Sequence, residues 1–207
     1  MRPMKRSRHY QYLQEFQAIR LRRDYDHFGQ QPEYAALADF FFNDMYGPRD
    51  FSARDTQARR LHQFIHLAPG LSMRDIEVTL DLLDLTVRLD EQLAAQLEKN
   101  QAPVPFDEAT YERAYRDADA YQPRVRQIDL ISESLLRVHR LAKMPLLGTA
   151  LNNSKTIARV MGMGDLHRFL RKGYNALESV EDLKPFLNEV TARELERLDR
   201  IYEGATS

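Results

Sequence analysis

The chain has 207 residues, of which 43% are hydrophobic and 29% are charged, and its formal net charge is −1. It contains no cysteine, which excludes disulfide bonds, thiolate metal sites and a cysteine nucleophile. No apolar stretch is long enough to span a bilayer, and the basic start is not followed by the apolar run of a secretory signal. We therefore expect a cytoplasmic protein without a transmembrane segment.

The first third of the chain predicts three helices. Apolar residues recur at helical spacing over residues 10–28, and Gly29 is a common C-terminal signal. A second helix is expected from Pro32 to Met45, where Tyr-Gly-Pro stops it. Ser52 is a good N-cap for a third helix, which Pro-Gly closes after Leu67.

Residues 72–100 contain neither Gly nor Pro and predict one long helix. At about 100° per residue, its apolar side chains cover a wider arc than the stripe of a surface helix. We therefore expect a central buried helix near residues 73–98. Thr79, Thr86 and Asp90 fall inside the apolar arc, and Asp90 is the only charged residue there.

The second half adds further helices, and Pro145 interrupts the one that begins at Pro123. Residues 100–106 resemble a linker, so any domain boundary falls there. Ser179 is expected to be the N-cap of the last helix. No strand-like alternation or repeat competes, so the prediction is an all-α, single-domain bundle of about eight helices spanning residues 1–207. The predicted helices of this half cover residues 107–121, 123–141, 148–162, 165–177 and 180–204.

Asp90 needs a partner if the central helix buries it. An isolated carboxylate among leucines is unfavourable unless a cation or several hydrogen-bond donors face it. Arg54, Arg124 and Arg126 are the candidate partners. A structural ion pair is the first interpretation, and a ligand-binding or catalytic acid is the second. If burial ends before Asp90, the residue is simply solvated.

Positive charge gathers between residues 137 and 172, where eight Lys and Arg stand against one acid, Asp165. Such a segment suits an anion-facing interaction patch. Internal neutralisation by the acidic side of the central helix is the alternative. The basic residues are Arg137, Arg140, Lys143, Lys155, Arg159, Arg168, Arg171 and Lys172.

The segment from residue 40 to 55, FFFNDMYGPRDFSARD, is the most distinctive local sequence. We interpret its aromatic residues as a corner wedged between helices. Three consecutive phenylalanines cannot all point inward from one helix, so at least one meets another helix, a partner or an apolar ligand. The residues that define this corner are Phe41, Phe42, Tyr46, Asp50, Phe51 and Asp55.

The histidines give little support for a metal. His62 and His66 are four apart and share a helical face, but a metal site needs a third ligand. A haem needs one axial histidine, for which His62, His66, His139 and His167 are available. Because the phosphate-binding and nucleophile motifs of familiar enzymes are missing, we expect no catalytic residues.

Several of these strings together resemble a family of uncharacterised bacterial all-helical proteins. They are the corner residues, the pair Leu89-Asp90, Tyr115-Arg116, residues 126–128 and residues 145–148. The resemblance covers the chain from about Tyr34 onward. It implies a single cytoplasmic helical domain and no known activity, cofactor or catalytic residue.

Two hypotheses for function remain. The first is a non-enzymatic interaction domain whose basic segment binds a protein partner or an anionic membrane surface, with nucleic acid less favoured because no base-reading motif is present. The second is a bundle that holds an apolar or tetrapyrrole-type ligand such as haem with a histidine ligand. A homodimer formed through the surplus phenylalanine surface is compatible with both.

Overall fold

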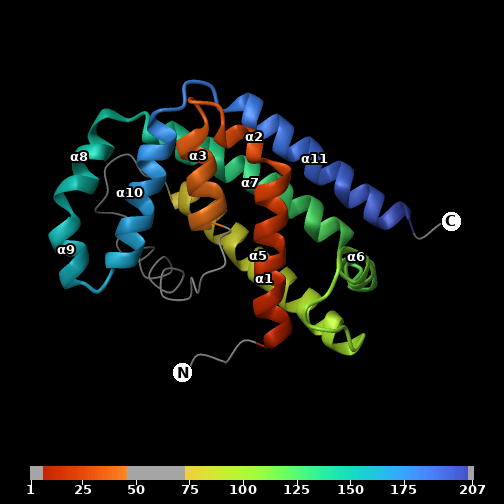
Figure 1. Ribbon diagram of the computed structural model, residues 1–207. Coiled ribbons are helices and arrows are strands. Elements are labelled where there is room, and N and C mark those ends of the chain that lie inside the picture. The colour runs from red at the N-terminus through yellow and green to blue at the C-terminus, as the bar shows by residue number, and fades with distance from the viewer. Residues whose placement is uncertain (1–6, 46–72, 205–207) are drawn as a thin grey trace.

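The computed structural model describes residues 7–45 and 73–204. Within these ranges every regular element is a helix, and the helices pack together as the predicted all-α bundle (Figure 1). The elements are α1 (Arg8–Asp24), α2 (Asp26–Gly29), α3 (Ala35–Phe40), the π-helix η1 (Phe41–Met45), α5 (Met73–Lys99), α6 (Glu108–Asp117), α7 (Tyr121–Ala142), α8 (Pro145–Asn153), α9 (Lys155–Val160), α10 (Gly164–Glu178) and α11 (Lys184–Glu203). Among the described helices, none has the length and apolar composition needed to cross a lipid bilayer.

Two long helices, α5 and α7, lie against each other through the middle of the bundle. As predicted, α5 is unbroken, and its Leu89, Leu93 and Leu97 are almost fully buried. It packs against α1, α6 and α7, whereas α7 also contacts α8, α10 and α11. The central position is therefore shared by these two helices.

Among the residues that the structure describes, the core consists of three apolar clusters. The largest joins the end of α1, α2, α3 and η1 to α7, α10 and α11. A second lies where the start of α1 meets the end of α5 and α6. A third fills the contact between α5 and α7. Polar side chains in the interior gather where these clusters meet.

The aromatic corner is built by a change of helix type. Phe40, Phe41 and Phe42 are all buried, because the wider turn of η1 begins at Phe41 and changes the direction in which successive side chains point. The ring centroids of Phe40 and Phe169 of α10 are 5.1 Å apart, and those of Phe41 and Phe186 of α11 are 5.8 Å apart. Phe40 and Phe41 thus meet other helices, as predicted, but because all three side chains are buried, none of the three supplies the surplus surface expected for a homodimer.

Some predicted helix boundaries were wrong. Ser179 does not cap α11, because its hydroxyl donates to the carbonyl of Ala176 and it ends α10 instead. The Asp182 carboxylate accepts the Lys184 N–H, 3.0 Å away, at the true start of α11.

Three predicted helices also begin or divide elsewhere. The first divides after Asp24 into α1 and α2. The second begins at Ala35 rather than Pro32, because a turn precedes it in which the Tyr34 N–H donates to Gln31. The helix predicted at 148–162 is two helices, since the Ser154 hydroxyl donates to the Leu151 carbonyl and closes α8.

Gly173 lets α10 pack closely on α3. A Cβ at this position would lie 2.8 Å from Cζ of the buried Phe40. We expect Gly173→Ala to lower the free energy of unfolding by about 1 kcal/mol, because overpacking outweighs the better helix propensity of alanine. Gly164→Ala is the matched control in the same helix, since an added Cβ there meets nothing within 4 Å. Urea denaturation of both variants tests this; equal stabilities would show that Phe40 yields freely.

Candidate functional site

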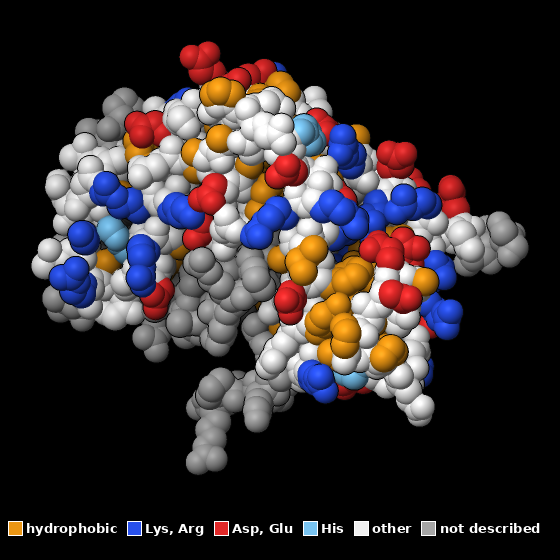
Figure 2. Space-filling model, in the orientation of Figure 1, with side chains coloured by type: hydrophobic (Ala, Val, Ile, Leu, Met, Phe, Trp, Pro, Cys, Tyr) orange, Lys and Arg blue, Asp and Glu red, His pale blue; other side chains and the backbone are white. Residues whose placement is uncertain are grey.

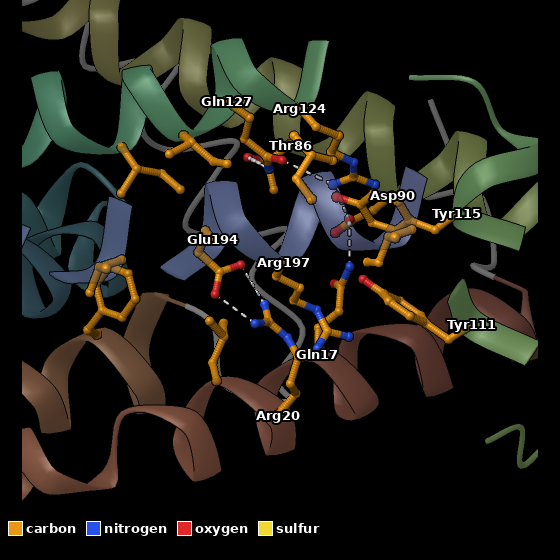
Figure 3. A pocket seen from close by; sticks show the side chains of 17 residues that line it. Gln17, Arg20, Thr86, Asp90, Tyr111, Tyr115, Arg124, Gln127, Glu194 and Arg197 are labelled. Carbon is orange, nitrogen blue, oxygen red and sulfur yellow. Dashed lines mark hydrogen bonds and ion pairs between the residues drawn. The ribbon is translucent and has the colours of Figure 1, made fainter. Parts of the chain in front are cut away.

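A polar cavity of about 90 Å³ lies where α1, α5, α6, α7, α11 and the start of η1 converge. Figure 3 shows side chains from these helices pointing toward one another across it. Its apolar walls come from the surrounding clusters, including Leu21, Phe41 and Val190. Its polar side chains are Gln17, Arg20, Thr86, Asp90, Tyr111, Tyr115, Arg124, Gln127, Glu194 and Arg197.

One side of the cavity is an ion pair between Arg20 of α1 and Glu194 of α11. Nη1 and Nη2 of Arg20 donate to the two carboxylate oxygens at 2.7 and 2.9 Å. The hydroxyl of Tyr25 donates to the same carboxylate at 2.8 Å. Burial lowers the pKa of Arg20, but the charge and hydrogen bonds of Glu194 raise it by more, so the guanidinium stays charged.

The Nε of Arg20 is buried and has no hydrogen-bond partner among the described residues. The residue as a whole is only 8% exposed. A buried N–H donor without a partner is costly in a folded protein. Although Arg20 lines the cavity, this atom has almost no accessible surface of its own, so it is enclosed by the protein and does not face the cavity.

The opposite side is formed by Asp90 of α5 and Arg124 of α7, which are 5% and 6% exposed. Nη1 of Arg124 lies 3.8 Å from the Asp90 carboxylate, which is longer than a hydrogen bond. Arg124 donates instead to the Gln127 side-chain oxygen at 3.0 Å and to the Leu89 carbonyl at 3.2 Å. The side-chain amide of Gln17 of α1 donates to the Asp90 carboxylate at 3.4 Å, so α1, α5 and α7 meet at this carboxylate.

Arg124 is held in place by its surroundings. Its guanidinium carbon lies 4.7 Å from the ring centroid of Tyr115, which is within the range of a cation–π contact. Gln127 donates to the Thr86 hydroxyl at 2.8 Å, so its side-chain oxygen is turned toward Arg124. Burial lowers the pKa of Arg124, but Tyr115 and Asp90 raise it by more, and the cation is fixed beside the cavity.

Arg197 and two tyrosines complete the lining near α6. Arg197, on α11, forms an ion pair with Glu108. Its guanidinium carbon lies 5.9 Å from the centroid of the Tyr111 ring. Burial raises the pKa of Tyr111 and of Tyr115, so both hydroxyls keep their protons at neutral pH. The cavity thus contains many more hydrogen-bond donors than acceptors.

The residues predicted around Asp90 are only partly brought together. Asp90 and Arg124 face each other, whereas Arg126 is exposed on α7. Arg54 lies outside the described residues. The sequence reasoning missed Arg20 and Glu194.

Helical spacing carried a signal for both missed residues. Arg20 is seven residues after the fully buried Leu13, and Glu194 lies four residues from the buried Val190 and Leu198. Each is therefore a charge within an apolar stripe, as Asp90 is. Helical periodicity, applied to α1 and α11 as it was to α5, indicates all three.

Of the other residues singled out in the sequence, Phe41, Thr86, Tyr115, Gln127 and Ile128 also line this cavity. The predicted corner residues Tyr46, Asp50, Phe51 and Asp55, and the pair His62 and His66, lie outside the described residues. His139 and His167 are each within hydrogen-bond distance of a backbone carbonyl, at 2.9 and 2.7 Å. Within the described part of the chain, no three His, Asp or Glu side chains come together as a metal site.

The basic segment forms part of the surface around α8, α9 and α10, and Figure 2 shows blue side chains gathered there. Several of its members are paired within the protein. Arg137 donates a hydrogen bond to Glu133, and Arg168 forms an ion pair with Asp165. Nζ of Lys172 lies 2.8 Å from the Asp39 carboxylate. Lys143 donates to the backbone carbonyl of Glu178. Neutralisation of the segment is therefore partial, and these acidic partners lie on α3, α7 and α10 rather than on the acidic side of α5.

A family model matches residues 2–207 of the chain, and its description is a domain of unknown function, DUF8198. The chain belongs to this family. No curated protein and no solved structure matches it. The expectation from the resemblance, an all-helical family without an assigned activity, is confirmed.

Proposed function

We propose that this DUF8198 protein is a non-enzymatic interaction domain that binds an anionic partner surface through α8, α9 and α10. The proposal rests on one observation, the exposed cations Lys155 and Arg159 of α9. Neither has an acidic partner among the described residues, and the half-buried Arg171 of α10 likewise has none there. Unneutralised cations on one face attract acidic protein surfaces and anionic lipid headgroups.

Exposed apolar side chains occur in the same part of the sequence as these cations. Met161, in the connection from α9 to α10, and Leu170, within α10, are 43% and 36% exposed. A surface that combines cations with exposed apolar groups suits the boundary of an anionic membrane or a mixed protein interface. Nucleic acid is the less favoured partner, since the whole chain carries a net charge of −1.

The test is a pair of binding assays at low and high salt. Co-sedimentation with phosphatidylcholine vesicles, with and without phosphatidylglycerol, measures membrane binding, and poly-L-glutamate serves as the probe for acidic protein. We expect binding to at least one anionic probe, weakened by salt because exposed charges are screened over about 10 Å at 0.1 M. Binding to neither anionic probe would overturn the proposal.

A double charge reversal locates the surface. Lys155→Glu with Arg159→Glu should weaken binding by about tenfold or more, since each cation near an anionic surface contributes about 1 kcal/mol. Arg88→Glu with Arg113→Glu makes the same change in net charge at exposed positions of α5 and α6. If this control lowers binding equally, net charge rather than the α8–α10 face is responsible.

A further inference from the structure

We propose that the exposed face of α1 binds a second copy of this chain, with the two α1 helices lying antiparallel. This face is separate from the α8–α10 surface, and the inference does not depend on whether that surface binds a partner. Three features of α1 point to a second copy: an apolar strip, its place on the outside of the bundle and the order of the charges beside it.

The apolar strip consists of three side chains at helical spacing, Tyr12, Phe16 and Ile19. Intervals of four and three residues place them on one side of α1. Ile19 is 60% exposed, the highest value among the large hydrophobic side chains of the described residues. The ring centroids of Tyr12 and Phe16 lie 4.7 and 5.3 Å from that of Phe106. The strip therefore joins two packed aromatic rings to a large aliphatic side chain that is mostly exposed.

The strip lies on the outside of the bundle. The opposite side of α1 carries Leu13 and Leu21 into the core, and in Figure 1 the helix lies in front of α5, against which it packs. Figure 2 shows apolar side chains gathered around the first half of α1 and α6 on this side of the molecule. Exposed apolar groups that adjoin one another mark protein interfaces, and a narrow apolar strip along a helix suits another helix.

The charges beside the strip favour a second α1 as that helix. Glu15 lies four residues before Ile19, whereas Arg22 and Arg23 lie three and four residues after it. When two α1 helices lie antiparallel and cross at this isoleucine, Glu15 of each copy comes opposite the two arginines of the other. The two-fold symmetry of such a pair repeats every contact, so the same attraction acts on both sides of the crossing point.

These charged groups have little competing pairing within the chain. Glu15 is exposed and has no ion pair among the described residues. Arg22 donates to the neutral side chain of Asn43, and Arg23 lies 2.9 Å from the carboxylate of its sequence neighbour Asp24. A parallel pair of helices would instead bring like charges together, which is unfavourable. The charge order therefore selects the antiparallel arrangement.

The extent of the face indicates a weak dimer. Because α1 has 17 residues, it is about 25 Å long at about 1.5 Å per residue. A contact limited to one such helix pair belongs to the small, transient class of interfaces, so we expect a dissociation constant on the order of 10–100 µM.

Sedimentation equilibrium of the full chain at about 1 to 300 µM, which spans this range, tests the proposal. We expect a monomer–dimer equilibrium in which Ile19→Asp raises the dissociation constant by about tenfold or more, because it places two carboxylates at the centre of the contact. Leu136→Asp is the matched control, since Leu136 is 46% exposed on α7, and it should leave the dimer unchanged. A monomer throughout the range, or equal effects of the two substitutions, would overturn the proposal.

An exchange of charges tests the antiparallel order. Glu15→Arg alone should weaken self-association by about fivefold or more, since like charges then meet on both sides of the crossing point. Adding Arg22→Glu and Arg23→Glu to this variant restores opposite charges and should return the dissociation constant to within about twofold of its original value. Circular dichroism shows whether each variant is folded. A folded triple variant that associates as weakly as Glu15→Arg would contradict the antiparallel pair.

Covalent capture locates the centre of the contact. The chain has no cysteine, so Ile19→Cys provides one thiol per copy, and the two thiols lie opposite each other at the two-fold axis. Diamide, which oxidises two thiols to a disulfide, should link this variant at least about tenfold faster than Leu136→Cys at equal concentration. Equal rates of linkage would show that the copies do not meet at Ile19.

Discussion

Replacing Glu194 by alanine should lower the free energy of unfolding by about 3–5 kcal/mol, the range for removing one partner of a buried ion pair. The loss has two physical sources. Arg20, whose side chain is 9% exposed, would keep its charge without its close partner. The hydroxyl of the fully buried Tyr25 would lose its acceptor 2.8 Å away.

Urea denaturation measures the effect, and Glu196→Ala is its matched control. Glu196 is exposed on the same helix, so its substitution should change stability by no more than about 0.5 kcal/mol. The double variant Arg20→Met with Glu194→Met should recover much of the stability, because no unpaired charge remains inside. A loss below about 1 kcal/mol in Glu194→Ala would mean that water replaces the carboxylate without cost.

The size of this effect follows from the position of the pair in the fold. Arg20 and Glu194 are 174 residues apart in the sequence and join α1 to α11. Tyr25, the residue that follows α1, donates a hydrogen bond to the same carboxylate. The pair therefore connects the two ends of the described chain across the cavity, beside the apolar cluster that Leu21 and Tyr25 share with Val190.

Most of the fold could be predicted from the sequence because its elements follow local rules. The unbroken apolar pattern of α5 and the Asp107 cap of α6, whose carboxylate accepts from the Thr110 N–H, depend only on nearby residues. The boundaries that failed depend on contacts beyond the sequence window. Ser179 has the chemistry of an N-cap, but its hydroxyl bonds backward to Ala176, and no local pattern distinguishes the two roles.

The site could be predicted only in part, for the same reason. Burial of Asp90 follows from the periodicity of one helix, and Arg124 was a reasonable partner because it opens another strongly apolar helix. The convergence of Gln17, Arg20 and Glu194 on the same cavity depends on how α1 and α11 pack, which no pattern along the chain specifies. Periodicity therefore finds buried charges, whereas the pairing among them requires tertiary structure.

Raising the pH from 8 to 11 should lower the free energy of unfolding by about 3 kcal/mol through Tyr25 and Tyr115, and Tyr111 should add to this loss. Burial is the largest cause that raises the pKa of Tyr25, Tyr111 and Tyr115, and Glu194 raises that of Tyr25 further. In the unfolded chain a tyrosine loses its proton near pH 10, whereas the folded protein retains it. Stability is thus fully present below pH 10 and falls above it, by about 1.4 kcal/mol at pH 11 for each of Tyr25 and Tyr115.

Urea denaturation at pH 8, 10 and 11 measures this dependence, and Tyr25→Phe separates one contribution. This variant loses the hydrogen bond to Glu194 at every pH, so its stability at pH 8 should be lower. Its further loss between pH 8 and 11 should nevertheless be smaller than that of the unaltered protein by about 1.4 kcal/mol, because one ionisable group is gone. Stability that stays constant up to pH 11 in the unaltered protein would show that these hydroxyls ionise as easily in the folded state as in the unfolded chain.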